Sequence, residues 1–149
     1  MKKYHYLILF FIINILAQST AHSAKSDFFD QGKQLFEKKE YEKSKIFFEK
    51  DIVFNPKSEM SYLYLGKIYE KIENDEESEK NLNSVLMLNP TNEEAIYILT
   101  LLRIKQSDYE GTKELFDRFN LVCKSLCNKK TEINNKFEKL IPLNEKDNN

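Results

Sequence analysis

A recurrence every 34 residues is the feature that most constrains how this chain can fold. Gly32 recurs as Gly66, and the pair Asn55-Pro56 recurs as Asn89-Pro90. Other positions keep the same register in both copies: Lys33 and Lys67, Ser44 and Ser78, Phe48 and Leu82, Ile52 and Leu86, Phe54 and Leu88. A third copy is weaker and retains Tyr109-Glu110 for Tyr41-Glu42, and Leu99 for Leu65. Self-similarity at a fixed period of about 20 to 50 residues predicts an array of stacked units.

The apolar residues predict that each unit is helical. From about Lys25 they follow helical spacing, and no segment alternates with period two for long enough to predict a strand. Asn55-Pro56 and Asn89-Pro90 end helices, because the residue before a proline is pushed out of the α region. The expected helical segments include residues 28–36 and 41–54, 62–69 and 82–88, 95–104 and 109–122, and a last helix at about 128–140.

The first two dozen residues have the three parts of a secretory signal peptide. Lys2 and Lys3 precede an apolar run at about residues 6–16, and small residues follow that fit cleavage near residues 21–24. An uncleaved membrane anchor is the alternative, although the run is shorter than the roughly 20 residues that a spanning helix needs. We therefore expect a signal peptide at residues 1–24 and an exported, periplasmic or secreted protein. Loss of the two lysines leaves 21 of 23 basic residues against 24 acidic ones, a net charge of −3.

The repeat resembles the tetratricopeptide repeat (TPR), whose pattern is W-x2-L-G-x2-Y, A-x3-F and P over 34 residues. The second copy reads Tyr62-x2-Leu65-Gly66-x2-Tyr69, then Ser78-x3-Leu82 and Pro90. The first reads Phe28-x2-Gln31-Gly32-x2-Leu35, then Ser44-x3-Phe48 and Pro56. The third reads Ile96-x2-Leu99-Thr100-x2-Arg103, then Thr112-x3-Phe116, with Lys124 in place of the proline.

This resemblance implies an all-α solenoid of about three helix-turn-helix repeats. The repeat domain would span residues 25–141, with repeats at about 25–58, 59–92 and 93–126 and a capping helix at about 127–141. Residues 142–149 would form a disordered tail. The helical glycine would let the partner helix approach closely, opposite Ser44 in the first repeat and Ser78 in the second. Aromatic residues at positions 28, 62 and 69 would fill the space between successive hairpins.

Little in the sequence predicts an enzyme. Histidine occurs only at His5 and His22, in or beside the signal peptide, and neither a phosphate-binding glycine loop nor G-x-S-x-G occurs. The acidic run at residues 73–80 is typical of a solvated turn, with a weak cation site as the alternative. We expect no catalytic residue, no cofactor, no metal site and no nucleic-acid partner, and no membrane contact after signal cleavage.

Cys123 and Cys127 are the two cysteines of the chain. Their C-x3-C spacing matches neither the redox C-x2-C motif nor a zinc site. Export would favour a structural disulfide between them, across a break between the third hairpin and the capping helix. Free or intermolecular thiols, or a redox or metal role, are the alternatives.

In the TPR family, the first helix of each hairpin lines a concave groove that binds peptides or protein segments. The resemblance places nine residues in such a groove: Phe29, Lys33, Phe36, Leu63, Lys67, Glu70, Tyr97, Leu101 and Ile104. Ordinary core packing is the alternative for each apolar one. The family's clamp for C-terminal carboxylates needs Lys and Asn at two first-repeat sites that Phe29 and Lys33 occupy here, so that specificity is not expected.

The sequence therefore predicts an exported adaptor or scaffold that holds a protein or peptide partner. Two hypotheses from other classes remain. A thiol-redox accessory protein would use Cys123 and Cys127, and a membrane-anchored scaffold would retain its N-terminus.

Overall fold

The computed structural model describes residues 27–140, and this part of the chain is helical without any strand. The signal peptide expected at residues 1–24 and the tail expected at 142–149 lie outside the described residues. The elements are α2 (Phe28–Glu37), α3 (Tyr41–Phe54), α4 (Glu59–Lys71), α5 (Asp75–Leu88), α6 (Glu93–Lys105), α7 (Tyr109–Val122), η2 (Cys127–Lys129) and α8 (Lys130–Phe137). None of the helices between residues 27 and 140 is long and apolar enough to cross a membrane.

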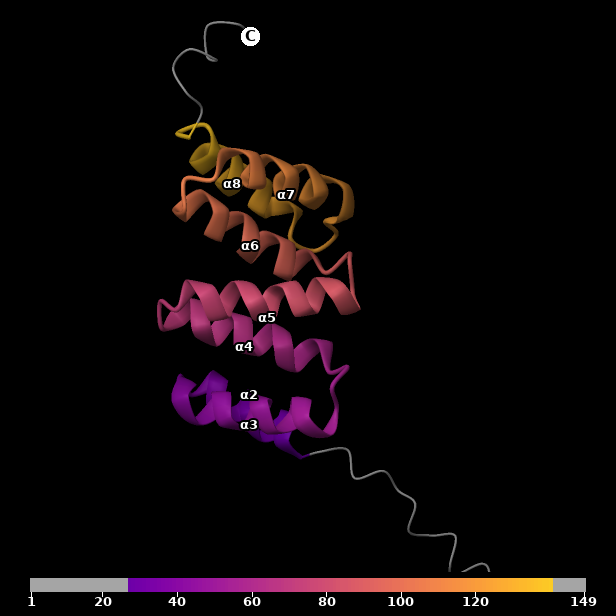
Figure 1. The fold of residues 1–149 in the computed structure, drawn as a ribbon. Coiled ribbons are helices and arrows are strands. Elements are labelled where there is room, and N and C mark those ends of the chain that lie inside the picture. Colours follow the sequence, from indigo (N-terminus) through magenta and orange to yellow (C-terminus); the bar gives the residue numbers. More distant parts are fainter. Residues whose placement is uncertain (1–26, 141–149) are drawn as a thin grey trace, which may run out of the picture.

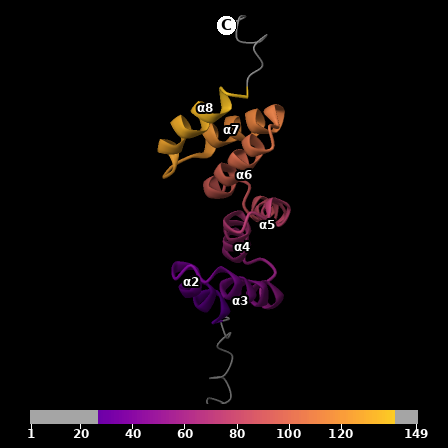
Figure 2. The same cartoon turned by 90° about the vertical axis from the view of Figure 1, so that its left-hand side faces the viewer.

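The helices pair into three antiparallel hairpins, α2–α3, α4–α5 and α6–α7, which stack along one axis (Figures 1 and 2). The bounds of the second helices recur at the 34-residue period, from α3 to α5 to α7, and those of α4 recur in α6. The predicted all-α solenoid of three helix-turn-helix repeats with a C-terminal cap is confirmed.

Each hairpin turns through a residue in the left-handed region. Lys39, Glu73 and Ser107 have φ angles of 60°, 59° and 58°, and they are 34 residues apart. Left-handed backbone normally favours glycine, so these turns lack the residue that would have marked them in the sequence. Two of the helices that follow are capped by side chains, since Asn74 accepts from the amide of Glu77 and Asp108 from that of Gly111; such caps satisfy amides that have no partner within the helix.

The glycines of α2 and α4, Gly32 and Gly66, act as the sequence predicts. A Cβ at Gly66 would lie 2.7 Å from Leu82 of the partner helix, and one at Gly32 would lie 3.0 Å from the Phe48 ring. The absent side chain thus lets the two helices of each hairpin approach closely. The hydroxyl of Ser78 donates a hydrogen bond to the carbonyl oxygen of Gly66 at 2.9 Å.

The third repeat replaces this arrangement with two fully buried threonines. Thr100 stands at the glycine position, and its hydroxyl donates to the carbonyl of Ile96 at 2.7 Å. Thr112 stands at the serine position and donates to the carbonyl of Asp108 at 2.6 Å. Both hydroxyls are satisfied within their own helices, so the third hairpin closes without a hydrogen bond across it from these residues.

Two of the three aromatic residues expected between successive hairpins lie there, and the third, Phe28, does not. Tyr62 and Tyr69 pack against buried clusters as expected, but Phe28 stacks on Phe54 of its own hairpin, with ring centroids 5.6 Å apart. Tyr64 takes the bridging role between the first two hairpins, because its ring stacks on Phe48 at 4.8 Å. Position 64 lies outside the 34-residue family pattern, so the resemblance to that pattern assigned no role to Tyr64.

The C-terminal segment covers the third hairpin. Ile133 of α8 is fully buried with Ile96 and Phe119, and Phe137 stacks on Tyr109 at 5.1 Å. The expected helix at about 128–140 is divided, because η2 precedes α8 and the residues after Phe137 form a turn. The cap therefore packs on residues of both α6 and α7.

Candidate functional site

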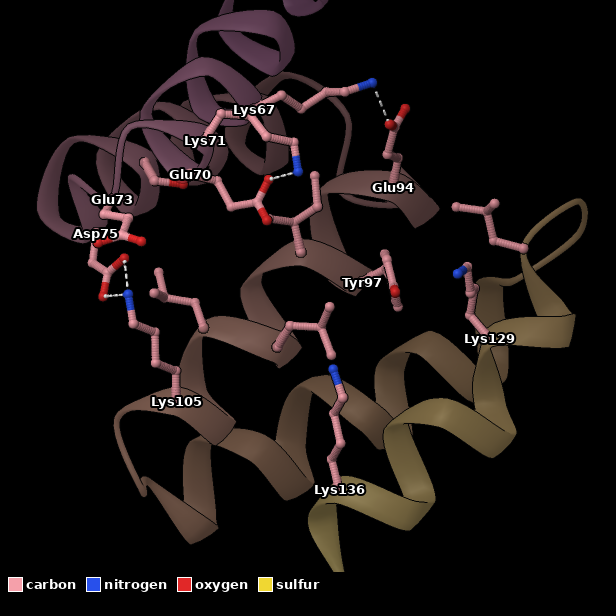
Figure 3. Close-up of a pocket in the computed structure, with 15 residues that line it drawn as sticks. Lys67, Glu70, Lys71, Glu73, Asp75, Glu94, Tyr97, Lys105, Lys129 and Lys136 are labelled. Atoms are coloured by element: carbon pink, nitrogen blue, oxygen red, sulfur yellow. Dashed lines mark hydrogen bonds and ion pairs between the residues drawn. The ribbon is translucent and has the colours of Figure 1, made fainter.

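A pocket of about 630 Å³ opens between α4, α6 and the C-terminal cap, next to the start of α5 (Figure 3). Its lining combines apolar side chains with charged ones that surround them. The lining residues are Lys67, Glu70, Lys71, Glu73, Asp75, Ser78, Glu94, Tyr97, Ile98, Leu101, Leu102, Lys105, Leu126, Lys129 and Lys136.

Four of the nine groove residues predicted from the sequence line this pocket: Lys67, Glu70, Tyr97 and Leu101. They come from α4 and α6, the first helices of the second and third hairpins. The structure thus brings part of the predicted set together and confines it to two repeats.

The residues predicted on the first repeat lie elsewhere. Phe29 and Phe36 are half-buried, and their rings meet Tyr64 edge-on at 5.8 Å and 5.0 Å. Both phenylalanines therefore pack in the interface between hairpins. The Phe36 ring also lies 5.5 Å from the ammonium of Lys67, a pocket residue, so it adjoins the pocket without lining it. Lys33 is exposed on α2 and does not line the pocket.

Leu63 and Ile104 are also placed differently from the sequence expectation. Leu63 is only 2% exposed and packs with Val85 and Leu99 between the second and third hairpins, so it offers a pocket ligand almost no surface. Ile104 is half-buried beside the cluster that the cap closes. The core-packing alternative describes Leu63, whereas Ile104 keeps part of its side chain at the surface.

Tyr97 connects the pocket to the cap. Its hydroxyl donates a hydrogen bond to the carboxylate of Glu132 at 2.9 Å, and both Lys129 and Lys136 lie 3.1 Å from the same carboxylate. Hydrogen bonds from Lys136, Lys129 and Tyr97 lower the pKa of Glu132 to about 2. Partial burial, and then the bond to Glu132, raise the pKa of Tyr97 above its usual value. Glu132 therefore stays ionised and holds two pocket lysines in place.

The opposite side of the pocket is held by two ion pairs between hairpins. Lys67 of α4 lies 2.6 Å from Glu94 of α6, and Lys105 of α6 lies 2.7 Å from Asp75 of α5. The hydrogen bond that Lys105 donates to the Asp75 carboxylate raises the pKa of Lys105. Figure 3 shows the Lys105–Asp75 pair on the side away from the cap and the Lys67–Glu94 pair where α4 faces the start of α6. Each is partly exposed and contributes modestly to stability, but together they define the polar border of the pocket.

The sequence reasoning missed the contribution of the cap. Leu126, Lys129 and Lys136 line the pocket, yet they lie beyond the third repeat, where the family pattern assigns no groove position. The apolar spacing of Ile133 and Phe137 predicted that the last helix would pack on the repeats. It did not indicate which residues the helix would turn toward the groove.

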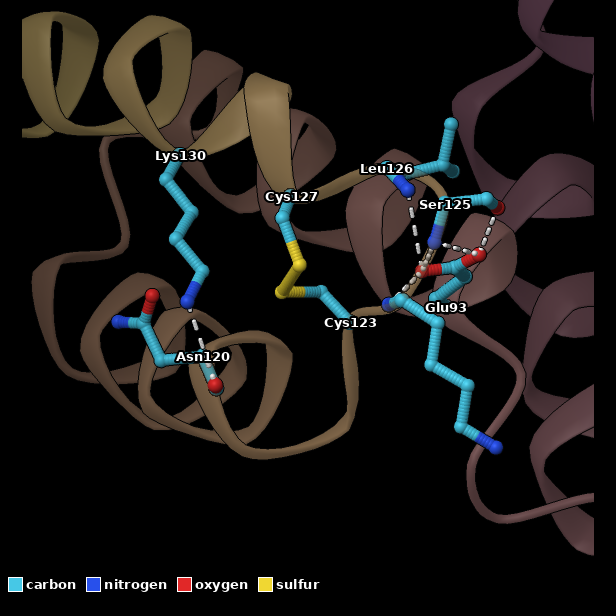
Figure 4. Close-up of a disulfide and its surroundings, with 8 residues drawn as sticks. Glu93, Asn120, Cys123, Ser125, Leu126, Cys127 and Lys130 are labelled. Atoms are coloured by element: carbon cyan, nitrogen blue, oxygen red, sulfur yellow. Dashed lines mark hydrogen bonds between the residues drawn. A yellow bond between two sulfur atoms is a disulfide. The ribbon is translucent and has the colours of Figure 1, made fainter.

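The structure joins Cys123 and Cys127 in a disulfide, with Cα atoms 5.2 Å apart (Figure 4). As the sequence predicts, the helix breaks between them: α7 ends at Val122, and η2 begins at Cys127. Cys123 packs beside the buried cluster that the cap closes.

Glu93, the first residue of α6, fixes the loop inside the disulfide. Its carboxylate accepts hydrogen bonds from the backbone amides of Lys124, Ser125 and Leu126 and from the Ser125 hydroxyl (Figure 4). The hydroxyl bond, followed by the amide bonds, lowers the pKa of Glu93 to about 2. The loop is therefore tied to the third repeat by a carboxylate and to itself by the disulfide.

Within residues 27–140, no group of three or more His, Cys, Asp or Glu side chains is placed to hold a metal ion. In the acidic run at residues 73–80, Asp75 pairs with Lys105 and Glu77 with Lys80. The run therefore serves as a turn and the start of α5.

Comparison with known proteins gives fold-level similarity. No protein-family model and no curated protein sequence matches the chain. Among solved structures, a chain of the CopN-Scc3 complex is 18% identical with a TM-score of 0.66, covering 78% of this chain and 70% of that one.

Two further structures are TPR domains by their descriptions. The second TPR domain of human RPAP3, solved with an HSP70 peptide, is 19% identical with a TM-score of 0.66, covering 80% of this chain and 96% of its own. The Sgt2 TPR domain from Aspergillus fumigatus is 16% identical with a TM-score of 0.62, and the match covers 79% of this chain and 77% of the Sgt2 chain. The repeat register, the stacked hairpins and these similarities together show that this chain has the tetratricopeptide repeat fold.

Proposed function

We propose that this protein is an interaction adaptor that binds an amphipathic segment of a partner protein in the pocket between α4, α6 and the cap. The observation that carries the proposal is the lining: Tyr97, Ile98, Leu101, Leu102 and Leu126 provide apolar surface within a charged border. Apolar surface gives affinity, while a few placed polar groups give orientation. The human RPAP3 domain, which was solved with an HSP70 peptide, supports peptide binding by this fold.

The charges suggest how a ligand would be oriented. Glu70, Glu73 and Asp75 gather where α4 turns into α5, whereas Lys129 and Lys136 extend from the cap (Figure 3). A helical segment with basic residues on one flank and acidic residues on the other would complement both sides. Its apolar stripe would face α6. Charge complementarity of this kind mainly fixes register and suppresses wrong partners.

We also propose that the protein works outside the cytoplasm, in the periplasm or as a secreted protein. The three-part N-terminus at residues 1–24 supports export. The Cys123–Cys127 disulfide is consistent with an oxidising compartment. Purified native protein should begin near residues 22–25. Recovery of the full-length chain in the membrane fraction would contradict cleavage and favour an anchored scaffold.

Site-specific photo-crosslinking tests the pocket. A benzophenone amino acid at Leu101 should crosslink in cells to a partner whose labelled peptide is amphipathic. The same probe at Met87, which is 85% exposed and outside the pocket, is the matched control. Charge reversal of Lys129 and Lys136 should weaken the Leu101 product without loss of helicity. Equal labelling of the same partner from both positions would contradict binding in the pocket.

A further inference from the structure

The first hairpin carries an aromatic surface that the pocket does not use, in which Phe28 and Phe47 are half-buried and Phe54 is exposed. The ring of Phe28 lies 5.6 Å from that of Phe54 and 6.4 Å from that of Phe47. Phe54 is 71% exposed, and the neighbouring Val53 is 74% exposed. We call these four residues the N-terminal aromatic face.

This face lies outside the core of the molecule. The cluster between the first and second hairpins contains Phe29, Phe36 and Phe48, but none of the four residues of the aromatic face. The hairpin is the terminal one of the stack, at the indigo end of Figure 1. Among residues 27–140, these aromatic rings pack on one another, and none of them joins the cluster shared with the second hairpin.

The repeat supplies an internal comparison. At the positions equivalent to Val53 and Phe54, the second repeat has Met87 and Leu88, which are 85% and 39% exposed. Exposed single apolar residues are common on protein surfaces and need no explanation. In the first repeat, aromatic rings that contact one another lie beside these apolar residues. The second repeat has no such group at the equivalent positions: Tyr62, equivalent to Phe28, packs on a buried cluster, and Asn81 stands at the position of Phe47.

Lysines accompany the aromatic face. The ammonium of Lys50 lies 5.7 Å from the centre of the Phe28 ring and 5.5 Å from that of Phe47. Lys57 is exposed in the loop after Phe54, and neither lysine forms an ion pair within residues 27–140. Aromatic rings with free lysines at their border are the combination that suits a lipid headgroup region.

The net charges of the first two repeats also favour the first hairpin as the part that contacts an anionic membrane. Residues 27–58 contain seven lysines and seven acidic residues, whereas residues 59–92 contain three lysines and seven acidic residues. The first hairpin is thus neutral, while the second carries a net charge of −4. An anionic lipid surface would repel the second repeat and leave the first one free to approach.

The chain enters the first hairpin from its membrane-targeting segment. The apolar run at about residues 6–16 lies about ten residues before Asp27, a distance that spans at most roughly 35 Å when fully extended. Under the proposed export, this segment would hold the first hairpin close to the lipid surface until signal cleavage, and the mature chain would then depend on the aromatic face alone. The aromatic face includes the first helical residue of this hairpin, Phe28, and its last one, Phe54.

We propose that the N-terminal aromatic face docks this protein on the surface of a phospholipid membrane that contains anionic lipid, with Phe54 and Val53 inserted and Lys50 and Lys57 at the headgroups. The pocket is built from the second and third hairpins and the cap, so it remains open to a partner. The sequence alone predicted no membrane contact after signal cleavage; the exposed face provides the reason for one.

Vesicle co-sedimentation tests the proposal. The chain from residue 25 onward, which contains every helix and cluster described above, should sediment with vesicles of phosphatidylethanolamine and phosphatidylglycerol. The double variant Val53→Glu/Phe54→Glu should lower the partition coefficient about tenfold or more, because two inserted apolar side chains become charged. Phosphatidylcholine vesicles should bind more weakly, since they offer the lysines no net negative charge.

The matched control is Met87→Glu/Leu88→Glu, which adds the same charges at the equivalent positions of the second repeat. It should leave vesicle binding within about twofold, with both variants retaining wild-type helicity by circular dichroism. Equal losses in the two variants, or no vesicle binding by the wild type, would overturn the proposal. A concentration-dependent dimer that Phe54→Glu abolishes, without vesicle binding, would instead assign the face to a second copy of the chain. Charge reversal of Lys129 should leave vesicle binding unchanged, which separates this test from that of the pocket.

Discussion

The hydroxyl of Tyr97 donates a hydrogen bond to the carboxylate of Glu132 across 2.9 Å, and this bond ties the surface of the pocket to the capping helix. Glu132 in turn orders Lys129 and Lys136, both of which line the pocket. The cap is therefore both the C-terminal end of the solenoid and one wall of its candidate binding site.

Replacing Tyr97 with Phe should loosen the cap while preserving the aromatic packing against Phe119. We expect a loss of about 1 kcal/mol in the free energy of unfolding. Hydrogen exchange should accelerate in α8 more than in α2. Tyr64→Phe is the control, since the Tyr64 hydroxyl makes no hydrogen bond within residues 27–140. Equal protection of α8 in the wild type and Tyr97→Phe would show that the bond does not hold the cap.

Replacing Gly66 with Ala should destabilise the protein, although alanine is the better helix former. The new Cβ would lie 2.7 Å from Leu82, which is fully buried and cannot easily move. Overpacking of this kind costs about 1 to 3 kcal/mol, more than the roughly 1 kcal/mol gained in helix propensity. Gly32→Ala should cost less, because its nearest contact is 3.0 Å. Urea unfolding of both variants checks the order, and a more stable Gly66→Ala protein would refute close approach as the reason for this glycine.

Acid should weaken the attachment of the cap through Glu93. Its pKa is about 2 in the folded protein against a usual value of 4.5. A lowered folded pKa means that the stabilisation is fully present above pH 4.5 and is lost as the pH falls toward 2. The melting temperature of Glu93→Gln should therefore differ most from wild type above pH 5, and the difference should shrink toward pH 2.

Glu110→Gln is the control for this titration, because Glu110 is exposed in the first turn of α7 and makes no hydrogen bond or ion pair within residues 27–140. Its melting temperature should follow that of the wild type across the same pH range. A constant difference between Glu93→Gln and wild type from pH 7 to pH 2 would contradict the role of the ionised carboxylate.

Removing the disulfide should destabilise the cap moderately. For a loop as short as that between Cys123 and Cys127, the chain-entropy treatment gives a loss of about 2 kcal/mol. The double variant Cys123→Ser/Cys127→Ser should melt at a lower temperature, and its hydrogen exchange should increase mainly in α8. Mass spectrometry of unreduced native protein should find the two cysteines joined. Two free thiols in protein taken from an oxidising compartment would contradict the bond.

The sequence by itself determined the repeating part of the fold. The 34-residue period gave the three hairpins, and the glycines with their opposing serines gave the close helix contacts, because these features depend on residues that face each other within one repeat. The break between Cys123 and Cys127 followed from the same register, which places the end of a repeat at Lys124.

The tertiary structure alone decided which side chains form the candidate site. Whether a residue on the first helix of a hairpin faces solvent depends on what its neighbours place over it: Tyr64 covers Phe29 and Phe36, and the third hairpin covers Leu63. The cap does not repeat, so no internal register could place Leu126, Lys129 or Lys136. Their position follows from how α8 packs on α6 and α7, and that packing depends on contacts between segments far apart in the chain.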